Sequence, residues 1–298
     1  MRTGYVILNY ETWWETLECV KSILHVYDGD LRDDGIVIVD NGSTNDSVER
    51  LKQEYQDAEN IFLIENKINL GFAKGNNVGF QYCKYEMNCD FIVMMNSDII
   101  IQDPQFRQKM IDAYGSGQFA VAGPNVINPD GTKLNPVYSG LITRKDIEKR
   151  IEESRRRILL CKLGLDPLAS ATQRIRNMAF GKRNKQGNAE TGEQFEIDLQ
   201  NGVQLQGCFF IFSPIYVKAF DGLYERTFLY GEETLLRLRC KRAGMKMAYL
   251  DQITVLHKES RTVKHIKGSL TEKHLRRFQY TLEAMQIIHD YMENENLI

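Results

Sequence analysis

The sequence lacks the features that mark several large classes of protein. No window approaches the roughly 20 apolar residues that a membrane-spanning helix requires, and MRTGYVILNY at the N-terminus has no long apolar segment of a secretory signal. The net charge is only −2, which gives no global attraction to nucleic acid. We therefore expect a cytoplasmic protein with no nucleic-acid partner, and we expect any membrane contact to be peripheral.

Cysteine frameworks are missing too. The six cysteines include no C-x-x-C pair and show no zinc-like spacing with the five histidines. Most of them lie inside apolar runs, which is typical of reduced thiols in a protein core. The apolar fraction of 43% is ordinary for a globular protein, so a chain of 298 residues has enough apolar surface for a substantial core.

Short apolar runs alternate with longer amphipathic segments over roughly the first 130 residues. We expect strands at GYVILNY (4–10), GIVIVD (35–40), NIFLIEN (60–66) and DFIVMMNSD (90–98). Apolar residues recur at helical spacing in 12–27, 46–56 and 72–85, and Pro104 opens a further helix. This alternation predicts an α/β fold with a mainly parallel sheet.

The second half of the chain has a different pattern of apolar and charged residues. We expect strands at FAVAGPNVI (119–127), LQGCFFIF (205–212) and MKMAYLDQITVLH (245–257), and a helix at 231–244 that Gly244 closes. A charge-dense helix at 144–157 and a polar, loop-like stretch at 182–194 have too few apolar residues for a core of their own. We interpret 141–200 as an insertion and 269–291 as one or two C-terminal helices.

Polar residues collect where four predicted strands end, at 9–10, 40–42, 66–71 and 96–98. In an open parallel sheet, ligands bind at the carboxyl ends of the strands. A divalent cation could use Asp98 as an oxygen ligand, and Asp40 could accept hydrogen bonds from a base or a ribose. Turns or helix caps explain both segments as well, with Ser43 or Thr44 as the cap that follows Asp40.

Glycines at 71, 75 and 79 lie four residues apart, which on a helix makes a flat face for close packing. They form no known phosphate loop, but Lys74 and the nearby asparagines could meet a phosphate at the start of that helix. The pair Glu232 and Glu233 begins another helix, where acids are favourable. One of them could instead be a general base, because adjacent carboxylates raise each other's pKa.

His257 ends a predicted strand and is either structural or a metal ligand. Beyond it, RTVKHIK supplies Arg261, Lys264 and Lys267, which form either a solvated face or a clamp on a diphosphate.

Taken in order, these segments resemble the family 2 glycosyltransferases, inverting enzymes of the GT-A fold that use nucleotide-activated sugars. The resemblance rests on VILNYE, VDNGSTND, ENKINLGFAKGNN, MMNSD, LQGCFFIF, FLYGEETLLRLRCKRAG and VLH. It implies a GT-A domain over 1–268 and a C-terminal helical extension over 269–298. Within the domain it implies a nucleotide-binding half (1–130), the insertion (141–200) and an acceptor half (201–268).

The resemblance also implies roles for individual residues. The residues that would line the nucleotide and diphosphate pocket are Asn9, Tyr10, Asp40, Asn69, Lys74, Asn96 and Arg261. Asp98 and His257 would bind Mn²⁺ or Mg²⁺, and Gly207 with Cys208 would face the donor sugar and the acceptor. Glu233, rather than Glu232, would act as the base.

Three positions depart from the family pattern. NSD replaces its D-x-D motif, which leaves Asp98 as one protein carboxylate for the metal. The base position holds glutamate rather than aspartate, so its carboxylate reaches further. Leu235 stands where many relatives carry a further acid, which leaves the type of acceptor open.

The expected reaction is an inverting sugar transfer from a nucleoside-diphosphate sugar, with UDP as the expected nucleotide. The expected acceptor is a hydroxyl of a glycan or polyprenyl-linked oligosaccharide in bacterial surface polysaccharide synthesis. The basic, amphipathic stretches 144–157 and 258–277 are where we expect contact with an anionic membrane. A non-catalytic protein that binds sugar nucleotides or carbohydrates is the alternative, and the oligomeric state is left open.

Overall fold

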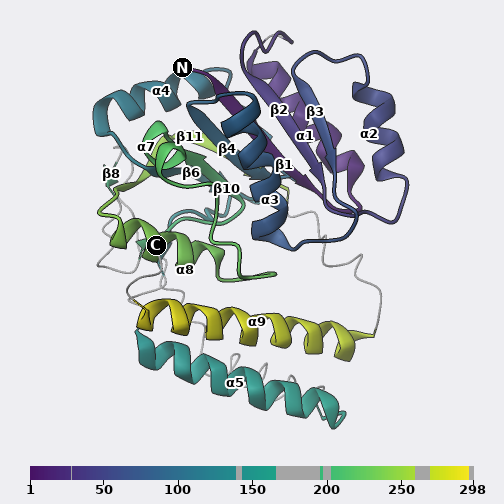
Figure 1. The fold of residues 1–298 in the computed structure, drawn as a ribbon, viewed down its shortest axis with the longest axis vertical. Coiled ribbons are helices and arrows are strands. Elements are labelled where there is room, and N and C mark those ends of the chain that lie inside the picture. Colours follow the sequence, from purple (N-terminus) through teal and green to yellow (C-terminus); the bar gives the residue numbers. More distant parts are fainter. Residues whose placement is uncertain (28, 139–142, 166–194, 197–202, 259–268, 295–298) are drawn as a thin grey trace.

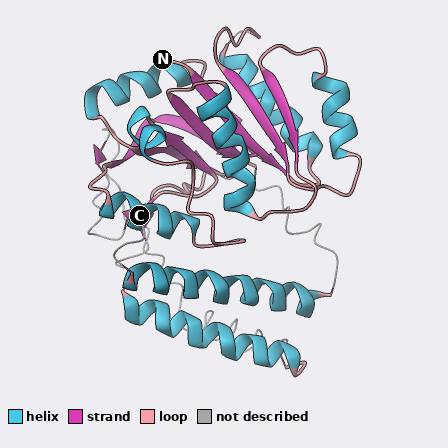
Figure 2. Cartoon of the chain, viewed as in Figure 1, coloured by secondary structure: helices cyan, strands magenta, loops and turns pink. Residues whose placement is uncertain are grey.

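The structure is a computed structural model that describes residues 1–27, 29–138, 143–165, 195–196, 203–258 and 269–294. Its main sheet has nine strands in the order β3-β2-β1-β4-β10-β6-β11-β5, with β8 (Phe195–Glu196) paired to β11. Helices cover both faces of this twisted sheet, and two long helices lie beside one of its ends (Figures 1 and 2). The predicted α/β class is thereby confirmed.

The first half of the sheet is parallel. It consists of β1 (Thr3–Asn9), β2 (Gly35–Asp40), β3 (Ile61–Glu65) and β4 (Phe91–Asn96). In the second half, β10 (Phe209–Phe212) is antiparallel to both β4 and β6 (Val121–Ile127). The long β11 (Met247–His257) is parallel to β6 and antiparallel to β5 (Ile99–Ile101). A separate two-stranded sheet pairs β7 (Val137–Tyr138) with β9 (Val203–Gln204).

The helices of the main body are α1 (Trp13–Val26), α2 (Ser47–Tyr55), α3 (Phe72–Gln81), the π-helical η1 (Tyr82–Glu86), α4 (Phe106–Gly117), α7 (Pro214–Ala219) and α8 (Glu232–Arg242). Outside the body lie α5 (Arg144–Lys162) and α9 (Leu270–Glu293).

The apolar core has two layers because successive side chains of a strand point to opposite faces of the sheet. On one face, Tyr5 and Ile7 of β1 pack in the same cluster as Cys19 and Val20 of α1. On the other face, Val6 packs with residues of α3, α7 and α8. Strands buried on both faces read as continuous apolar runs, which is why the sequence revealed them.

The glycine face of α3 is confirmed for Gly75 and Gly79, whereas Gly71 is the N-cap and faces Phe228. A Cβ at Gly79 would lie 2.5 Å from Cγ1 of Val6, and one at Gly75 would lie 2.8 Å from Cδ1 of Leu8. Only glycine lets α3 approach β1 this closely, so the helix that follows the β3 loop is fixed directly over the end of β1.

The helices α5 and α9 pack against each other in antiparallel fashion. Arg144 pairs with Glu293 at 3.3 Å, while the guanidinium of Arg157 lies 4.9 Å from the ring centroid of Phe278. Ile147 of α5, Leu235 of α8 and Ile288 of α9 share a third buried cluster. The apolar side of the charge-dense helix is therefore covered by α9, and the cluster ties both helices to α8.

Most predicted elements match, and the 269–291 region forms one helix, which is one of the two possibilities expected. α4 begins at Phe106 rather than at Pro104. The short β5 after β4, the helix α7 and the β7–β9 pair were not predicted. The polar stretch 182–194 lies outside the described residues. None of the helices in the described part of the chain is both long and apolar enough to cross a membrane.

Candidate active site

The sheet register brings the predicted strand ends to one edge. Asn9 lies opposite Asp40, and Leu8 lies opposite Asn96 at the end of β4. In the other half of the sheet, His257 at the end of β11 pairs with Ile99 of β5. Ile99 comes directly after the turn that contains Asp98. Parallel pairing of β1, β2 and β4 is what gathers these separate segments.

Asp40 organises the loop after β2. Its side chain is 1% exposed, and its Oδ2 accepts hydrogen bonds from Nδ2 of Asn9 and from Oγ of Ser43, both at 2.7 Å. The backbone N–H of Ser43 donates to Oδ1 at 2.9 Å. These three bonds use three of the about four acceptor positions of an ionised carboxylate. The suggestion that Ser43 or Thr44 caps α2 is wrong, because Thr44 instead donates to Glu11.

Asn41 holds the segment between β3 and α3. Its Nδ2 donates to Oδ1 of Asn69 at 3.1 Å and to the carbonyl of Gly71 at 3.0 Å, while its Oδ1 accepts from the N–H of Leu70. Asn69 also accepts from the N–H of Gly71. Lys74 is exposed on the first turn of α3, and the N-terminus of a helix favours anions. Sequence reasoning named Asn69 but missed the central position of Asn41.

Asp98 and His257 lie side by side. Nε2 of His257 is 3.3 Å from Oδ1 of Asp98, with the two side chains 14% and 9% exposed. The backbone N–H of Lys258 donates to the carbonyl of Asp98 at 3.0 Å, which ties the two segments together. Nδ1 of His257 is buried and has no hydrogen-bond partner. A buried polar atom without a partner carries a free-energy cost, but Nδ1 is not the ring nitrogen that faces Asp98.

This pair fits a divalent cation. Two neighbouring ligands of an octahedral ion, each at about 2.1 Å, lie about 3 Å apart, close to the separation of Asp98 and His257. A carboxylate oxygen and an imidazole nitrogen are both ligands that Mn²⁺ accepts. In the part of the chain that the structure describes, no group of three or more histidine, cysteine or acidic residues could hold a metal. Any bound ion would complete its shell with water and substrate oxygens.

Lys258 is a residue that the sequence did not single out. Its Nζ donates to Oε2 of Glu15 at 2.7 Å and also contacts Oε2 of Glu18, both on α1. These contacts fix the chain just after His257. No local signal could have revealed them, since the partners are 243 and 240 positions away.

Glu232 and Glu233 begin α8 and have different surroundings. Glu232 is 6% exposed and accepts a hydrogen bond from Oγ1 of Thr227 at 3.2 Å. Burial, and then the charge of Glu233, raise its pKa to about 7. Burial also raises the pKa of Glu233, whose carboxylate packs against Gly207. The charge of Glu233 therefore raises the pKa of Glu232, as expected from the sequence, but burial of Glu232 is the larger cause of the raised pKa.

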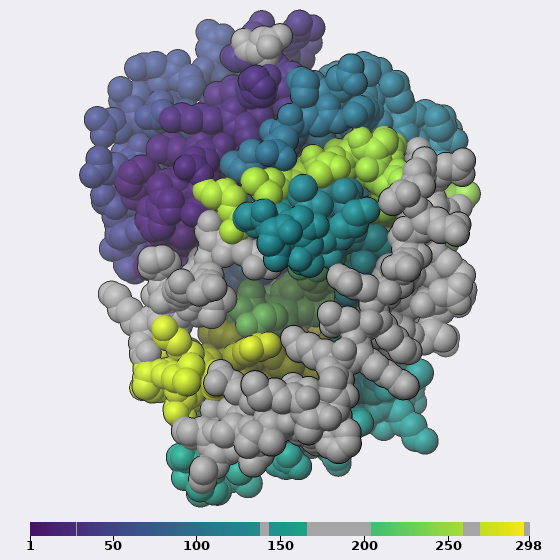
Figure 3. All heavy atoms as spheres, turned by 180° about the vertical axis from the view of Figure 1, so that it is seen from behind, coloured from purple at the N-terminus to yellow at the C-terminus, as the bar shows by residue number. Residues whose placement is uncertain are grey.

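Cys208 connects the two acidic sites. Its thiol pKa is raised by burial first and then by the charges of Asp98 and Glu233, so both carboxylates lie within electrostatic reach of this sulfur. The carbonyl of Cys208 accepts from the N–H of Asn96 at 2.9 Å. Seen from behind, the surface is hollowed between teal residues near β6 and yellow residues of α9, with green residues of the β10–α8 region at its floor (Figure 3).

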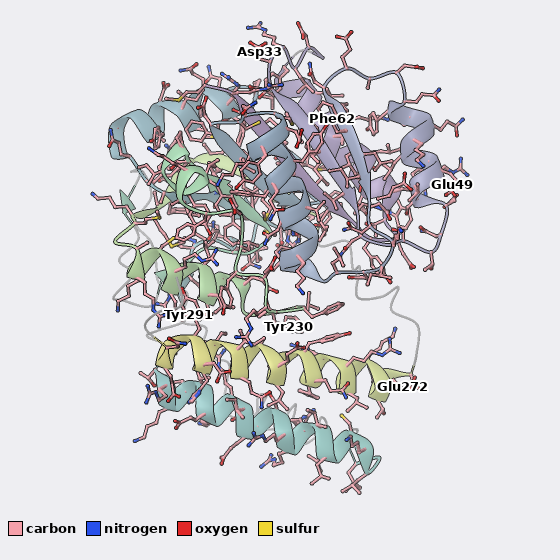
Figure 4. The ribbon with its side chains drawn as sticks, in the orientation of Figure 1. Asp33, Glu49, Phe62, Tyr230, Glu272 and Tyr291 are labelled. Carbon is pink, nitrogen blue, oxygen red and sulfur yellow. The ribbon has the colours of Figure 1, made fainter. Side chains whose placement is uncertain are left out.

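The loop before α8 links three elements. The carbonyl of Phe228 accepts from the N–H of Phe72 at 2.8 Å, and its ring stacks on Tyr280 of α9 with centroids 4.8 Å apart. Tyr230 has a φ of 76° and is 37% exposed. Figure 4 shows it on the loop between the sheet and α9. A left-handed tyrosine is strained, and such strain concentrates at functional sites.

Two of the other predicted site residues have a defined place. Tyr10 is partly buried just beyond β1, and Asn96 is the last residue of β4. Arg261 lies outside the described residues. The structure thus joins Asn9 to Asp40 and, through Asn41, to Asn69, and it separately joins Asp98 to His257.

Comparisons with known proteins identify the family and the fold. Residues 6–178 match the family model described as glycosyl transferase family 2. A low-salt glycan biosynthesis hexosyltransferase, Agl10 of Haloferax volcanii, is 26% identical over 110 residues, which is 36% of this chain and 34% of that protein. The match therefore spans about a third of the length of that relative.

Solved structures share the fold. The S. aureus TarS 1–349 complex with UDP-GlcNAc superposes with a TM-score of 0.56 at 13% identity, covering 99% of this chain and 72% of that one. GalNAc-T7 with UDP, GalNAc and Mn²⁺ gives a TM-score of 0.57 at 14% identity, covering 93% and 47%. The predicted GT-A fold is confirmed by these likenesses.

Proposed function

Because the chain belongs to glycosyl transferase family 2, we propose that it transfers a sugar from a nucleoside-diphosphate sugar to an acceptor hydroxyl, with inversion at the anomeric carbon. The observation that carries this proposal is the convergence of the Asp98–His257 pair and Glu233 on Cys208. The contact of Glu233 with Gly207, and the hydrogen bond from the N–H of Asn96 to the carbonyl of Cys208, support a base site and a diphosphate site that are both close to the start of β10.

The donor nucleotide would lie along the ends of β1, β2 and β4. Asp40 keeps an acceptor position for a base or ribose, in a loop braced by Asn9 and by Asn69 through Asn41. Tyr10 and Asn96 flank this edge, and the exposed Lys74 at the start of α3 would meet the phosphates. We propose UDP as the nucleotide, because the complexes of TarS and GalNAc-T7 contain it.

Asp98 and His257 would hold Mn²⁺ or Mg²⁺ against the diphosphate, as the geometry of this pair allows. When bound, the cation would neutralise the charge that grows on the leaving group. Arg261 would add a further positive charge there.

Glu233 would accept the proton of the attacking hydroxyl. Its raised pKa makes the carboxylate a stronger base than an exposed glutamate, and its position against Gly207 directs it toward the start of β10. Glu232 is held by Thr227 and would serve mainly to hold the start of α8.

The proposal extends to the setting of the reaction. The acceptor would be a glycan or a polyprenyl-linked oligosaccharide of a bacterial surface polysaccharide, at the cytoplasmic side of the membrane. The division into a GT-A domain at 1–268 and a helical extension at 269–298 belongs to this proposal, with the 141–200 insertion beside the acceptor.

Thermal unfolding with UDP, GDP, dTDP and CDP, each with and without Mn²⁺, tests the donor site. UDP at about 100 times its Kd should stabilise the protein by about 2.7 kcal/mol. We expect this shift to need Mn²⁺ and to disappear in Asp98→Ala, but to persist in Asp112→Ala, an exposed acid on α4. No shift with any nucleotide in the wild-type protein would contradict the proposal.

The role of Glu233 as the base is tested by a variant that should still bind UDP but should transfer sugar much more slowly. Glu233→Gln should keep the UDP shift and lower sugar transfer by about 10²–10⁴-fold, the usual contribution of a general base. Glu232→Gln is the matched control, with a smaller loss. If both variants transfer sugar at the wild-type rate, Glu233 is not the base. UDP binding without transfer to any acceptor would favour a non-catalytic binding protein.

A further inference from the structure

Exposed leucines gather at one end of the α5–α9 pair. Nine large apolar side chains are exposed in the part of the chain that the structure describes, and four of them are Leu159 (56%), Leu163 (61%), Leu165 (43%) and Leu270 (67%). An isolated exposed leucine needs no explanation, but a group of them marks an interaction surface.

The antiparallel pairing is what brings these leucines together. Arg157 lies over Phe278, so the residues that follow Arg157 lie beside the start of α9. We call residues 153–165 together with 269–278 the leucine tip. In Figure 4 this tip is the end of the helix pair near the labelled Glu272, away from the end near Tyr291.

The leucine tip is strongly basic. It carries seven cationic side chains (Arg155, Arg156, Arg157, Lys162, Lys273, Arg276 and Arg277) and only two carboxylates (Glu153 and Glu272). The opposite end of the pair, residues 143–152 and 283–294, carries four cationic side chains and six carboxylates. The exposed leucines therefore occur only at the positive end of these two helices.

We propose that the leucine tip docks the enzyme on an anionic lipid surface. Leucine side chains can enter the boundary between headgroups and acyl chains, while lysine and arginine stay at the level of the lipid phosphates. Each cation near such a surface strengthens binding, and the acidic opposite end would be repelled. The charge distribution thus fixes which end of the helix pair faces the lipid.

This surface refines the acceptor class and in that respect rests on the proposed function. In Figure 1 the tip lies on the side of the molecule where β1, β2 and β3 end, so docking would bring the candidate active site toward the lipid surface. A lipid-linked acceptor is the substrate that such an orientation suits. Lys258 takes no part in the docking, since it is paired with Glu15 and Glu18 on α1.

Sedimentation of the full chain with lipid vesicles tests the proposal. We expect binding to vesicles with about one third phosphatidylglycerol and much weaker binding to pure phosphatidylcholine. Leu163→Ser with Leu270→Ser, which leaves the charge unchanged, should weaken binding by about ten-fold or more, and so should Arg156→Gln with Arg276→Gln. Lys145→Gln with Lys149→Gln, at the acidic end, is the matched control and should bind as the wild type does.

Several outcomes would overturn the docking surface. Absence of binding to the anionic vesicles is one, and equal binding by the leucine variant and the wild type is another. The third is a dimer in solution that the leucine variant abolishes, because this result would assign the surface to a second copy of the chain. Because all substituted residues are exposed, thermal unfolding should be unchanged and serves as the folding control. The UDP shift is measured without lipid, so failure of docking and failure of the donor site are distinguishable.

Discussion

At the scale of single residues, two adjacent glutamates differ because a helix turns by about 100° per residue. Glu232 points toward Thr227 and Tyr230, whereas Glu233 packs against Gly207 beside Cys208. Local sequence does not separate their roles, since both residues stand in the first turn of the same helix, and only the family resemblance favoured Glu233.

The raised pKa of Glu232 predicts a pH-dependent stability. Its pKa of about 7 in the folded protein exceeds the ordinary 4.5. The protonated carboxyl therefore contributes to the free energy of unfolding in full below pH 4.5, and this contribution is lost as the pH rises through about 7. Between about pH 4 and pH 8 the free energy of unfolding of the wild type should fall by about 3 kcal/mol relative to that of Glu232→Gln. Urea unfolding of both proteins at several pH values measures this difference. Parallel pH curves would show that Glu232 titrates normally.

At the scale of elements, the position of α3 depends on glycine. Gly79 faces Val6 and Val39, and a Cβ there would lie 2.5 Å from Val6 and 3.0 Å from Val39. Gly115 in α4 is also helical, but a Cβ there would meet nothing within 4 Å. Alanine substitutions at these two positions therefore distinguish the effect of close packing, which applies only at Gly79, from the effect of helix propensity, which applies at both.

Gly79→Ala should therefore destabilise the protein by about 1–3 kcal/mol through overpacking. Gly115→Ala should instead stabilise it by about 0.5–1 kcal/mol, because alanine favours a helix. Urea unfolding measures both changes, and the Gly79 variant should also bind UDP more weakly because α3 begins at the nucleotide edge. Equal effects of the two substitutions would contradict the close contact between α3 and β1.

At the scale of the whole molecule, the α5–α9 pair is joined to the body through the cluster that contains Leu235 and Ile288. The ring pairs Tyr224–Tyr291 and Phe228–Tyr280 add contacts between α9 and the loop before α8. A shared core of this kind predicts that the pair and the body unfold together.

Ile288→Ala should lower the stability of the whole protein by about 2–5 kcal/mol, the usual effect of removing a buried isoleucine side chain. The exposed Gln279→Ala on the same helix is the control and should change it little. Calorimetry should show one transition in both variants. A second, lower transition in Ile288→Ala alone would mean that the helix pair unfolds as a separate unit.

The sequence by itself determined the strands of four or more residues and most of the helices, and it supplied the candidate site residues. Strands buried on both faces are continuous apolar runs, and the polar residues that end them stand out against those runs. Asp98 and His257 could be named for this reason, and the glutamate pair stood out as two adjacent acids at the start of a predicted helix. These are local signals, carried by neighbouring positions in the chain.

Only the tertiary structure decided which of those residues meet. It placed His257 against Asp98, Lys258 against Glu15 and Glu18, and both Asp98 and Glu233 near Cys208. It also joined α5 to α9 and so created the leucine tip from two distant segments. Contacts between positions more than a hundred residues apart depend on strand order and helix packing, and a single sequence contains no local pattern that specifies them.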